Sequence, residues 1–149
     1  MAIFEDQFMD IQIRMVSLAM EHVQGQADAI YIYGISEQEI ISYNVFFKIK
    51  DSVVKIHKVN SVLTNKVNTS DDMLFSLLRY GNEDLQALID LCDNNGHEHP
   101  TELWLVYDIK SKHLETKYNY EARYENDENL IPRLEFEKWF EEVKAEVNK

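Results

Sequence analysis

Apolar residues spaced three or four positions apart predict an amphipathic helix at each end of the chain. In residues 3–22 this spacing puts the apolar side chains on one face, and Gly25 follows where a left-handed turn can end a helix. Residues 132–147 repeat the pattern after Pro132, which suits a first helical position because it lacks an N–H group. The residues that define these stripes are Phe4, Phe8, Ile11, Met15 and Leu18, with His22 as a further candidate, in the first helix and Leu134, Phe136, Trp139, Phe140, Val143 and Val147 in the last.

A further helix is expected in the middle of the chain, over residues 71–94. Thr69 or Ser70 can cap its N-terminus, and the run Asn94-Asn95-Gly96 can end it. Gly81-Asn82 lies inside the pattern. Because glycine is a poor helix former, we expect a break or a kink there, which would divide the segment into two helices.

Five segments rich in β-branched and aromatic residues are expected to be strands. Residues 40–49 alternate apolar and polar side chains, which predicts a half-buried strand, and a turn at residues 50–52 joins them to a hairpin partner. Residues 102–109 are apolar on both sides, which predicts a central strand covered on both faces. The expected strands are residues 29–35, 40–49, 53–59, 102–109 and 114–124, with a polar break at residues 36–38 and loops at 59–69 and 126–129.

These elements follow the order helix, strand, strand, strand, helix, strand, strand, helix. Strands that are neighbours in sequence and joined by short turns pair antiparallel, and helices grouped apart from strands are typical of α+β proteins. The sequence therefore predicts a single α+β domain over residues 1–149, with a mostly antiparallel sheet and helices packed on it.

The net charge, the cysteine count and the lack of long apolar runs exclude several classes of function. The formal net charge is −12, so the chain as a whole repels nucleic acid and anionic membranes and attracts a basic partner. One cysteine excludes an internal disulfide and a multi-cysteine zinc site. The N-terminus does not have the pattern of a signal peptide, and no apolar run is long enough for a membrane span, so we expect a cytoplasmic protein that binds neither membrane nor nucleic acid directly. A homodimer formed through an exposed sheet edge stays open.

The charge is unevenly distributed. Residues 71–108 hold nine acidic residues and one basic residue, and residues 121–149 hold nine acidic and five basic residues. Residues 48–66 are the opposite, with five lysines and one aspartate. Most of the negative charge therefore lies in the second half of the chain.

No motif of a known catalytic site is present. Cys92, His97 and His99 could supply three metal ligands, and Asp90, Asp93 and Glu98 could serve as paired carboxylates, but neither set has the spacing of an established site. We favour a simpler interpretation of both sets, with a buried Cys92 beside a polar loop and the acids on a solvated helix face. We therefore expect no catalytic residue, no metal and no cofactor, with a metal-dependent enzyme as the least favoured alternative.

Tyrosines near the C-terminal third have two interpretations. Tyr118, Tyr120 and Tyr124 alternate with charged residues, a composition that protein interfaces favour, but the first two could equally cover the sheet under the last helix. The periodic positions of Trp104, Trp139 and Phe140 assign these residues to the core.

Several of these features together resemble the YezG-like family of bacterial immunity proteins. They are the amphipathic N-terminal helix, the aromatic strand pair around residues 31–47, a helix followed by Pro100-Thr101-Glu102-Leu103, and the run YDIKSKHLETKYNYEARYENDE before a last helix with Trp139. In that run the family has a Tyr-Asp pair, a turn and a tyrosine–acid pair, matched here by residues 107–108 and 120–121. The resemblance covers nearly the whole chain, although residues 60–68 have no clear counterpart.

The resemblance implies a non-catalytic, intracellular protein that neutralises a cognate toxin domain of a polymorphic toxin system, such as those of contact-dependent inhibition. Several toxins that members of the family neutralise are nucleases. Acidic side chains fit this role because they can occupy the places where a basic nuclease binds phosphates. The candidate toxin-binding residues are Asp90, Asp93, Glu98, Tyr118, Tyr120, Glu121, Tyr124, Glu125, Asp127 and Glu128. An adaptor or regulatory protein-binding module is the main alternative. The toxin, and whether its active site or an exosite is blocked, stay open.

Overall fold

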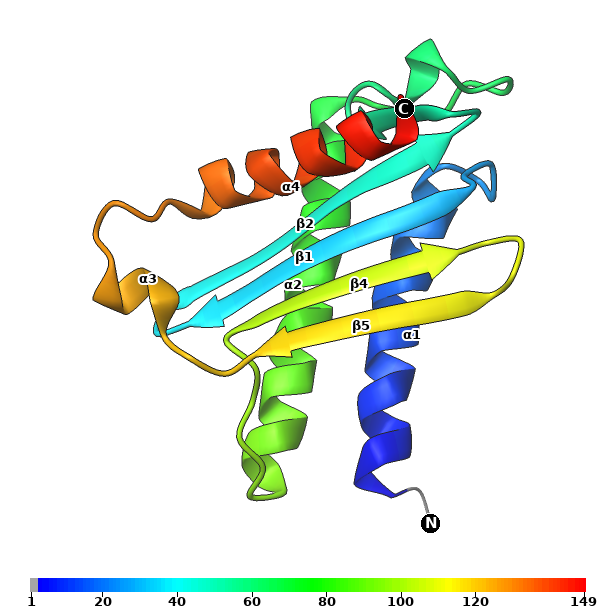
Figure 1. Cartoon of the computed structure of the whole chain (residues 1–149). Coiled ribbons are helices and arrows are strands. Elements are labelled where there is room, and N and C mark those ends of the chain that lie inside the picture. The colour runs from blue at the N-terminus through cyan, green and yellow to red at the C-terminus, as the bar shows by residue number, and fades with distance from the viewer. Residues whose placement is uncertain (1–2) are drawn as a thin grey trace.

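A five-stranded antiparallel sheet with helices on both faces forms the protein, in a computed structural model that describes residues 3–149 (Figure 1). The strand order is β3-β2-β1-β4-β5. The fold class and the order of the main elements, predicted from sequence, are confirmed. The elements are α1 (Phe4–His22), β1 (Ala29–Glu37), β2 (Ile40–Ile49), β3 (Ser52–Lys55), η1 (Val59–Ser61), α2 (Asp71–Asn94), β4 (Glu102–Asp108), β5 (His113–Asn119), α3 (Arg123–Asn126) and α4 (Pro132–Val147).

Helices α1 and α2 pack side by side on one face of the sheet (Figure 1). Their apolar stripes meet every second residue of the three central strands, as the alternation of side chains in a strand requires. This main core contains Met15, Ala19, Ile30, Ile32, Val45, Phe47, Leu85, Leu88, Leu103 and Leu105, each 3% exposed or less. Within residues 3–149, no helix is both long and apolar enough to cross a membrane.

Helix α4 covers part of the opposite face. Phe140 and Val143 pack on Phe46 of β2 and Val53 of β3, and the Tyr31 ring stacks on Phe46 with centroids 4.7 Å apart. The expectation of a half-buried second strand is therefore wrong at Phe46, which is fully buried because a helix distant in sequence covers its face.

Strand β4, in contrast, is less buried than the sequence predicts. Leu103 and Leu105 are buried under α1 and α2, but Trp104 and Val106 on the other face are only partly buried. Coverage on both faces was expected and is incomplete, because the apolar side chains of α4 pack on Tyr31, Phe46 and Val53 of β1, β2 and β3 (Figure 1). The outer face of β4 and β5 is thus less covered than that of β1 and β2.

Helix α2 is continuous, so the expected break at Gly81 is wrong. Gly81 is buried against the ring of Tyr43, and a Cβ atom there would lie 2.1 Å from Tyr43 Cδ2. Asn82 accepts a hydrogen bond of 2.8 Å from the Tyr43 amide and so ties the helix to β2. The absence of a side chain at Gly81 allows the helix to approach the sheet closely.

Three strand boundaries also differ from expectation. β1 continues through the expected polar break to Glu37, because the Ser36 amide donates to the Thr101 carbonyl. β3 ends at Lys55 in a turn, so its expected continuation to residue 59 is wrong. β5 ends at Asn119 instead of residue 124, and the next residues form the short helix α3.

Candidate functional site

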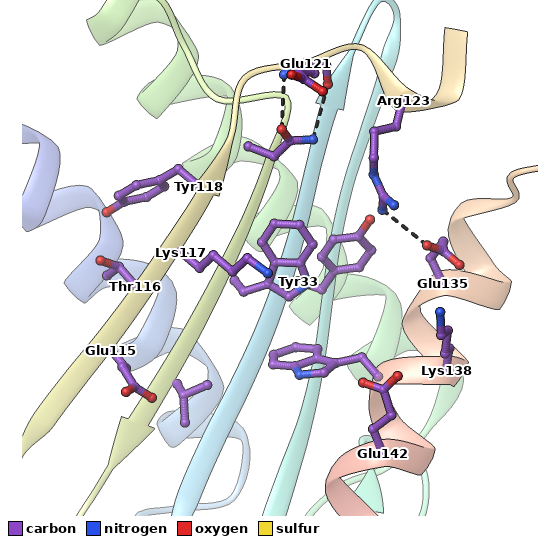
Figure 2. A pocket seen from close by; sticks show the side chains of 14 residues that line it. Tyr33, Glu115, Thr116, Lys117, Tyr118, Glu121, Arg123, Glu135, Lys138 and Glu142 are labelled. Atoms are coloured by element: carbon purple, nitrogen blue, oxygen red, sulfur yellow. Dashed lines mark hydrogen bonds and ion pairs between the residues drawn. The ribbon is translucent and has the colours of Figure 1, made fainter. Parts of the chain in front are cut away.

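A groove of about 820 Å³ lies on the outer face of β4 and β5, beside α4 (Figure 2). Its central residues are aromatic. The Tyr33 and Trp104 rings stack with centroids 5.3 Å apart, and the Trp139 ring meets Tyr33 edge-on at 6.5 Å. The prediction that Trp104 and Trp139 belong to the core therefore misses their second role, since both line this groove, whereas Phe140 is buried in the core as predicted.

Charged side chains form the rim of the groove. Glu115 of β5 and Glu142 of α4 come from opposite walls, and within residues 3–149 neither is in an ion pair. Lys117 lies over the Trp104 ring, with Nζ 4.9 Å from the centroid, a distance at which a cation is attracted by the ring face. The other charged lining residues are Glu121, Arg123, Glu135 and Lys138.

A buried carboxylate, Glu102, organises the segment that follows β5, whose Glu121 and Arg123 lie at the upper end of the groove in Figure 2. Glu102 is 1% exposed and accepts two hydrogen bonds from Arg123, at 2.5 Å to Nε and 2.8 Å to Nη2. It also accepts a hydrogen bond of 2.9 Å from the Tyr33 hydroxyl. A buried charge is tolerated only when it is paired in this way, so Arg123 is held in place by the sheet.

Two tyrosine hydroxyl groups extend this network. The Tyr33 and Tyr124 oxygens are 2.8 Å apart, and burial, followed by the contacts with Tyr124 and Glu102, raises the pKa of Tyr33 far above its usual value. Tyr33 therefore stays protonated and can donate to Glu102. The hydrogen bonds with Glu102 raise the pKa of Arg123, which carries its charge at any working pH and also contacts Glu135 at 3.2 Å.

A second buried carboxylate, Glu37 at the end of β1, fixes the next residues. It accepts a hydrogen bond of 3.0 Å from the Tyr124 amide and another from the Glu125 amide, and it is only 4% exposed. The first turn of α3 is thus bound to the sheet by two carboxylates, Glu37 and Glu102. The site residues predicted from sequence included neither, although an acid at the first or last position of an apolar strand is a signal that could have indicated both.

The candidate residues predicted from sequence fall into two groups at one end of the sheet. Asp90, Asp93 and Glu98 lie in or just after the C-terminal part of α2, whereas Tyr120, Glu121, Tyr124, Glu125, Asp127 and Glu128 lie in the segment between β5 and α4. Thr101 connects the groups, since its Oγ1 donates to the Glu121 carbonyl at 2.7 Å. All five acids between residues 98 and 128 in these groups are exposed.

The three candidate tyrosines have different environments. Tyr118 packs edge-on against Phe8 of α1 and donates a hydrogen bond of 2.7 Å to Gln12, so it covers the sheet under the first helix and not, as considered, under the last. Tyr124 is half-buried in the network described above. Tyr120 is 44% exposed, and partial burial together with Tyr118, Cys92 and Glu98 raises its pKa. Tyr120 is thus the most accessible of the three.

The residues considered as metal ligands are engaged separately. Cys92 is 1% exposed, and burial raises the pKa of its thiol. The His97 ring stacks on Phe4 at 3.9 Å, and His99 Nδ1 lies 3.1 Å from Asp93 Oδ1. Within residues 3–149, no group of three or more His, Cys, Asp or Glu side chains is arranged to hold a metal ion.

Comparison of the chain with models of known protein families finds no match, and comparison with curated proteins finds none either. The resemblance to YezG-like immunity proteins therefore stays a prediction.

Proposed function

We propose that the protein is a non-catalytic immunity protein that binds and neutralises a cognate bacterial toxin domain, a basic nuclease. The groove and the acidic segment, residues 121–128, which begins at the upper end of the groove in Figure 2, form the proposed binding surface. The proposal rests on the family resemblance, on the net charge of −12 and on the shape and chemistry of this surface.

The observation that carries the proposal is the combination of an aromatic floor with carboxylates on the rim. Lys117 already lies over Trp104, so this ring face accommodates a cationic side chain. A lysine or arginine of the partner could take that place and face Glu115 and Glu142. Aromatic residues and desolvated charge pairs of this kind dominate the binding energy of protein interfaces.

The fixed conformation of the acidic segment supports the same function. Glu37 accepts hydrogen bonds from the amides of Tyr124 and of Glu125 itself, and Arg123 is held by Glu102. Acids on a segment already ordered lose little conformational entropy when a partner binds. Long-range attraction between this surface and a basic domain also speeds association, which matters when a toxin must be captured before it acts.

The proposal is tested by co-expression with the C-terminal domain of the large protein encoded beside this chain. Rescue of growth and co-elution of a stable complex are expected. Toxicity that this chain does not relieve would refute the immunity function. A complex with a non-toxic partner would favour the adaptor function instead.

The binding surface is tested by reversing three charges in the acidic segment. We expect E125K/D127K/E128K to weaken toxin binding about tenfold or more in titration calorimetry, because favourable contacts with a basic partner become repulsive. The matched control is E21K/E83K/E146K, which changes the net charge equally at exposed positions on three helices. If both variants weaken toxin binding equally, the change in net charge alone accounts for the loss of affinity. Unchanged affinity in the first variant would place the interface elsewhere.

A further inference from the structure

β5 forms one edge of the sheet, and within residues 3–149 no strand pairs with its outer side (Figure 1). Such an edge presents free backbone N–H and C=O groups that can pair with another strand. Thr116, at the middle of β5, is exposed although its side chain lies on the same face as the partly buried Leu114 and Tyr118. The edge is therefore accessible along its centre.

The sequence of β5 is complementary to itself when two copies run antiparallel about Thr116. In that register Glu115 faces Lys117 of the other copy, and Lys117 faces Glu115. Leu114 faces Tyr118, and Thr116 faces Thr116. Opposite charges, an aliphatic–aromatic pair and a Thr–Thr pair are all favourable across neighbouring strands.

No other symmetric register keeps this complementarity. Residues that face each other across antiparallel strands must point to the same side of the sheet, so the two-fold axis has to pass through a residue. An axis at Glu115 would bring two glutamates together, and an axis at Lys117 would bring two lysines together. An axis at Leu114 or Tyr118 would leave no glutamate of β5 opposite a lysine of β5. The axis at Thr116 pairs each Glu115 with a Lys117, so the charges of β5 favour this register.

We propose that the protein forms a two-fold homodimer through antiparallel pairing of β5 with β5 of a second copy. The sheet would then continue across the interface as ten strands. This inference does not rest on the proposed immunity function and needs no toxin for its test.

An apolar strip beside the edge fits the same partner. Met9 and Ile13 of α1 are 40% and 49% exposed, and they line a groove of about 480 Å³ with Val16, Met20, Tyr107, Ile109 and Leu114. The groove includes Leu114 of β5, so it is continuous with the strand edge. A second copy paired at β5 would bring its own α1 toward this strip on the same face of the sheet. Apolar burial there would add to the area that strand pairing alone provides.

The test is a charge swap measured by sedimentation velocity or light scattering on the full chain. We expect the wild-type protein to be dimeric in the micromolar range. E115K and K117E should each raise the dimer dissociation constant about tenfold or more, because each replaces two favourable pairs with two like-charge pairs. The double variant E115K/K117E should restore the dimer, since its charges are again complementary.

Mixing the two single variants provides the sharpest discrimination. E115K carries two lysines on β5 and K117E carries two glutamates, so a heterodimer should form although neither variant self-associates. I13K, at an exposed position of the apolar strip, should also weaken the dimer. Circular dichroism checks that each variant is folded. A wild-type protein that stays monomeric up to high micromolar concentration would overturn the proposal, as would single variants that remain as dimeric as the wild type.

Discussion

Replacing Gly81 by alanine gives a direct test of the helix–sheet packing. On an exposed helical surface this change would stabilise the protein by about 1 kcal/mol, because glycine is the poorer helix former. Here the new methyl group would lie 2.1 to 2.6 Å from three ring carbons of Tyr43, well inside the contact distance of about 3.5–4.0 Å. Helix α2 or the Tyr43 ring must therefore move by more than about 1 Å.

The ring has little freedom to move. Tyr43 is 2% exposed, and its hydroxyl donates a hydrogen bond of 2.9 Å to the Met15 carbonyl of α1. Overpacking of this kind costs about 3 kcal/mol, the upper part of the usual range. After the gain in helix propensity, we expect G81A to lower the free energy of unfolding by about 2 kcal/mol and the melting temperature by about 4–8 °C.

Urea unfolding followed by circular dichroism measures the difference. E83A, at an exposed position two residues along the same helix, is the control and should change stability by less than about 0.5 kcal/mol. The near-ultraviolet spectrum should also change in G81A if the environment of Tyr43 changes. A G81A protein as stable as the wild type, or more stable, would refute the close contact.

Two further predictions concern buried polar groups. E102Q should lower the free energy of unfolding by about 2–4 kcal/mol, because the amide cannot accept both hydrogen bonds from Arg123. E135Q weakens one partly exposed contact with Arg123 and should lower it by about 1 kcal/mol or less. Equal losses of stability for the two variants in urea unfolding would contradict the network. Burial lowers the pKa of His22 despite its contact with the Ile56 carbonyl, so the unfolded chain gains a proton first and stability should fall as the pH falls below about 6.5. H22Q should lose part of this pH dependence and H57Q, at an exposed position, should keep it, as melting temperatures at several pH values would show.

Features set by local sequence were predictable. Ser70 caps α2 by accepting a hydrogen bond from the Met73 amide, and Pro132 occupies the start of α4, as their types and positions predict. The antiparallel pairing of β1 with β2 and of β4 with β5 follows from short turns between adjacent strands. These signals act within a few residues and do not depend on the rest of the fold.

Features that depend on distant partners were not predictable. A glycine inside a helix has the same sequence signal whether it breaks the helix or accommodates a ring, and only the position of Tyr43 decides between them. Phe46 is buried because α4 returns to the sheet about ninety residues later along the chain. For the candidate site, the acids predicted from sequence are exposed, and their role stays a prediction. The prediction did not include the contacts of Glu37 and Glu102 or the aromatic groove, which exist only once the sheet and α4 are assembled.

The two buried carboxylates indicate why the acidic segment keeps one conformation. Removing a charge from water costs several kcal/mol, so Glu37 and Glu102 are tolerated only when their partners are in place. Those partners are Arg123 and the amides of Tyr124 and Glu125, all in the segment after β5. If this segment left the sheet, Glu102 would lose Arg123 and Glu37 would lose both amides. An apolar contact at the same place is not directional, so it would allow the segment to shift along the sheet. The network therefore contributes less to net stability than to a unique geometry, and that geometry sets the direction in which the neighbouring acids face a partner.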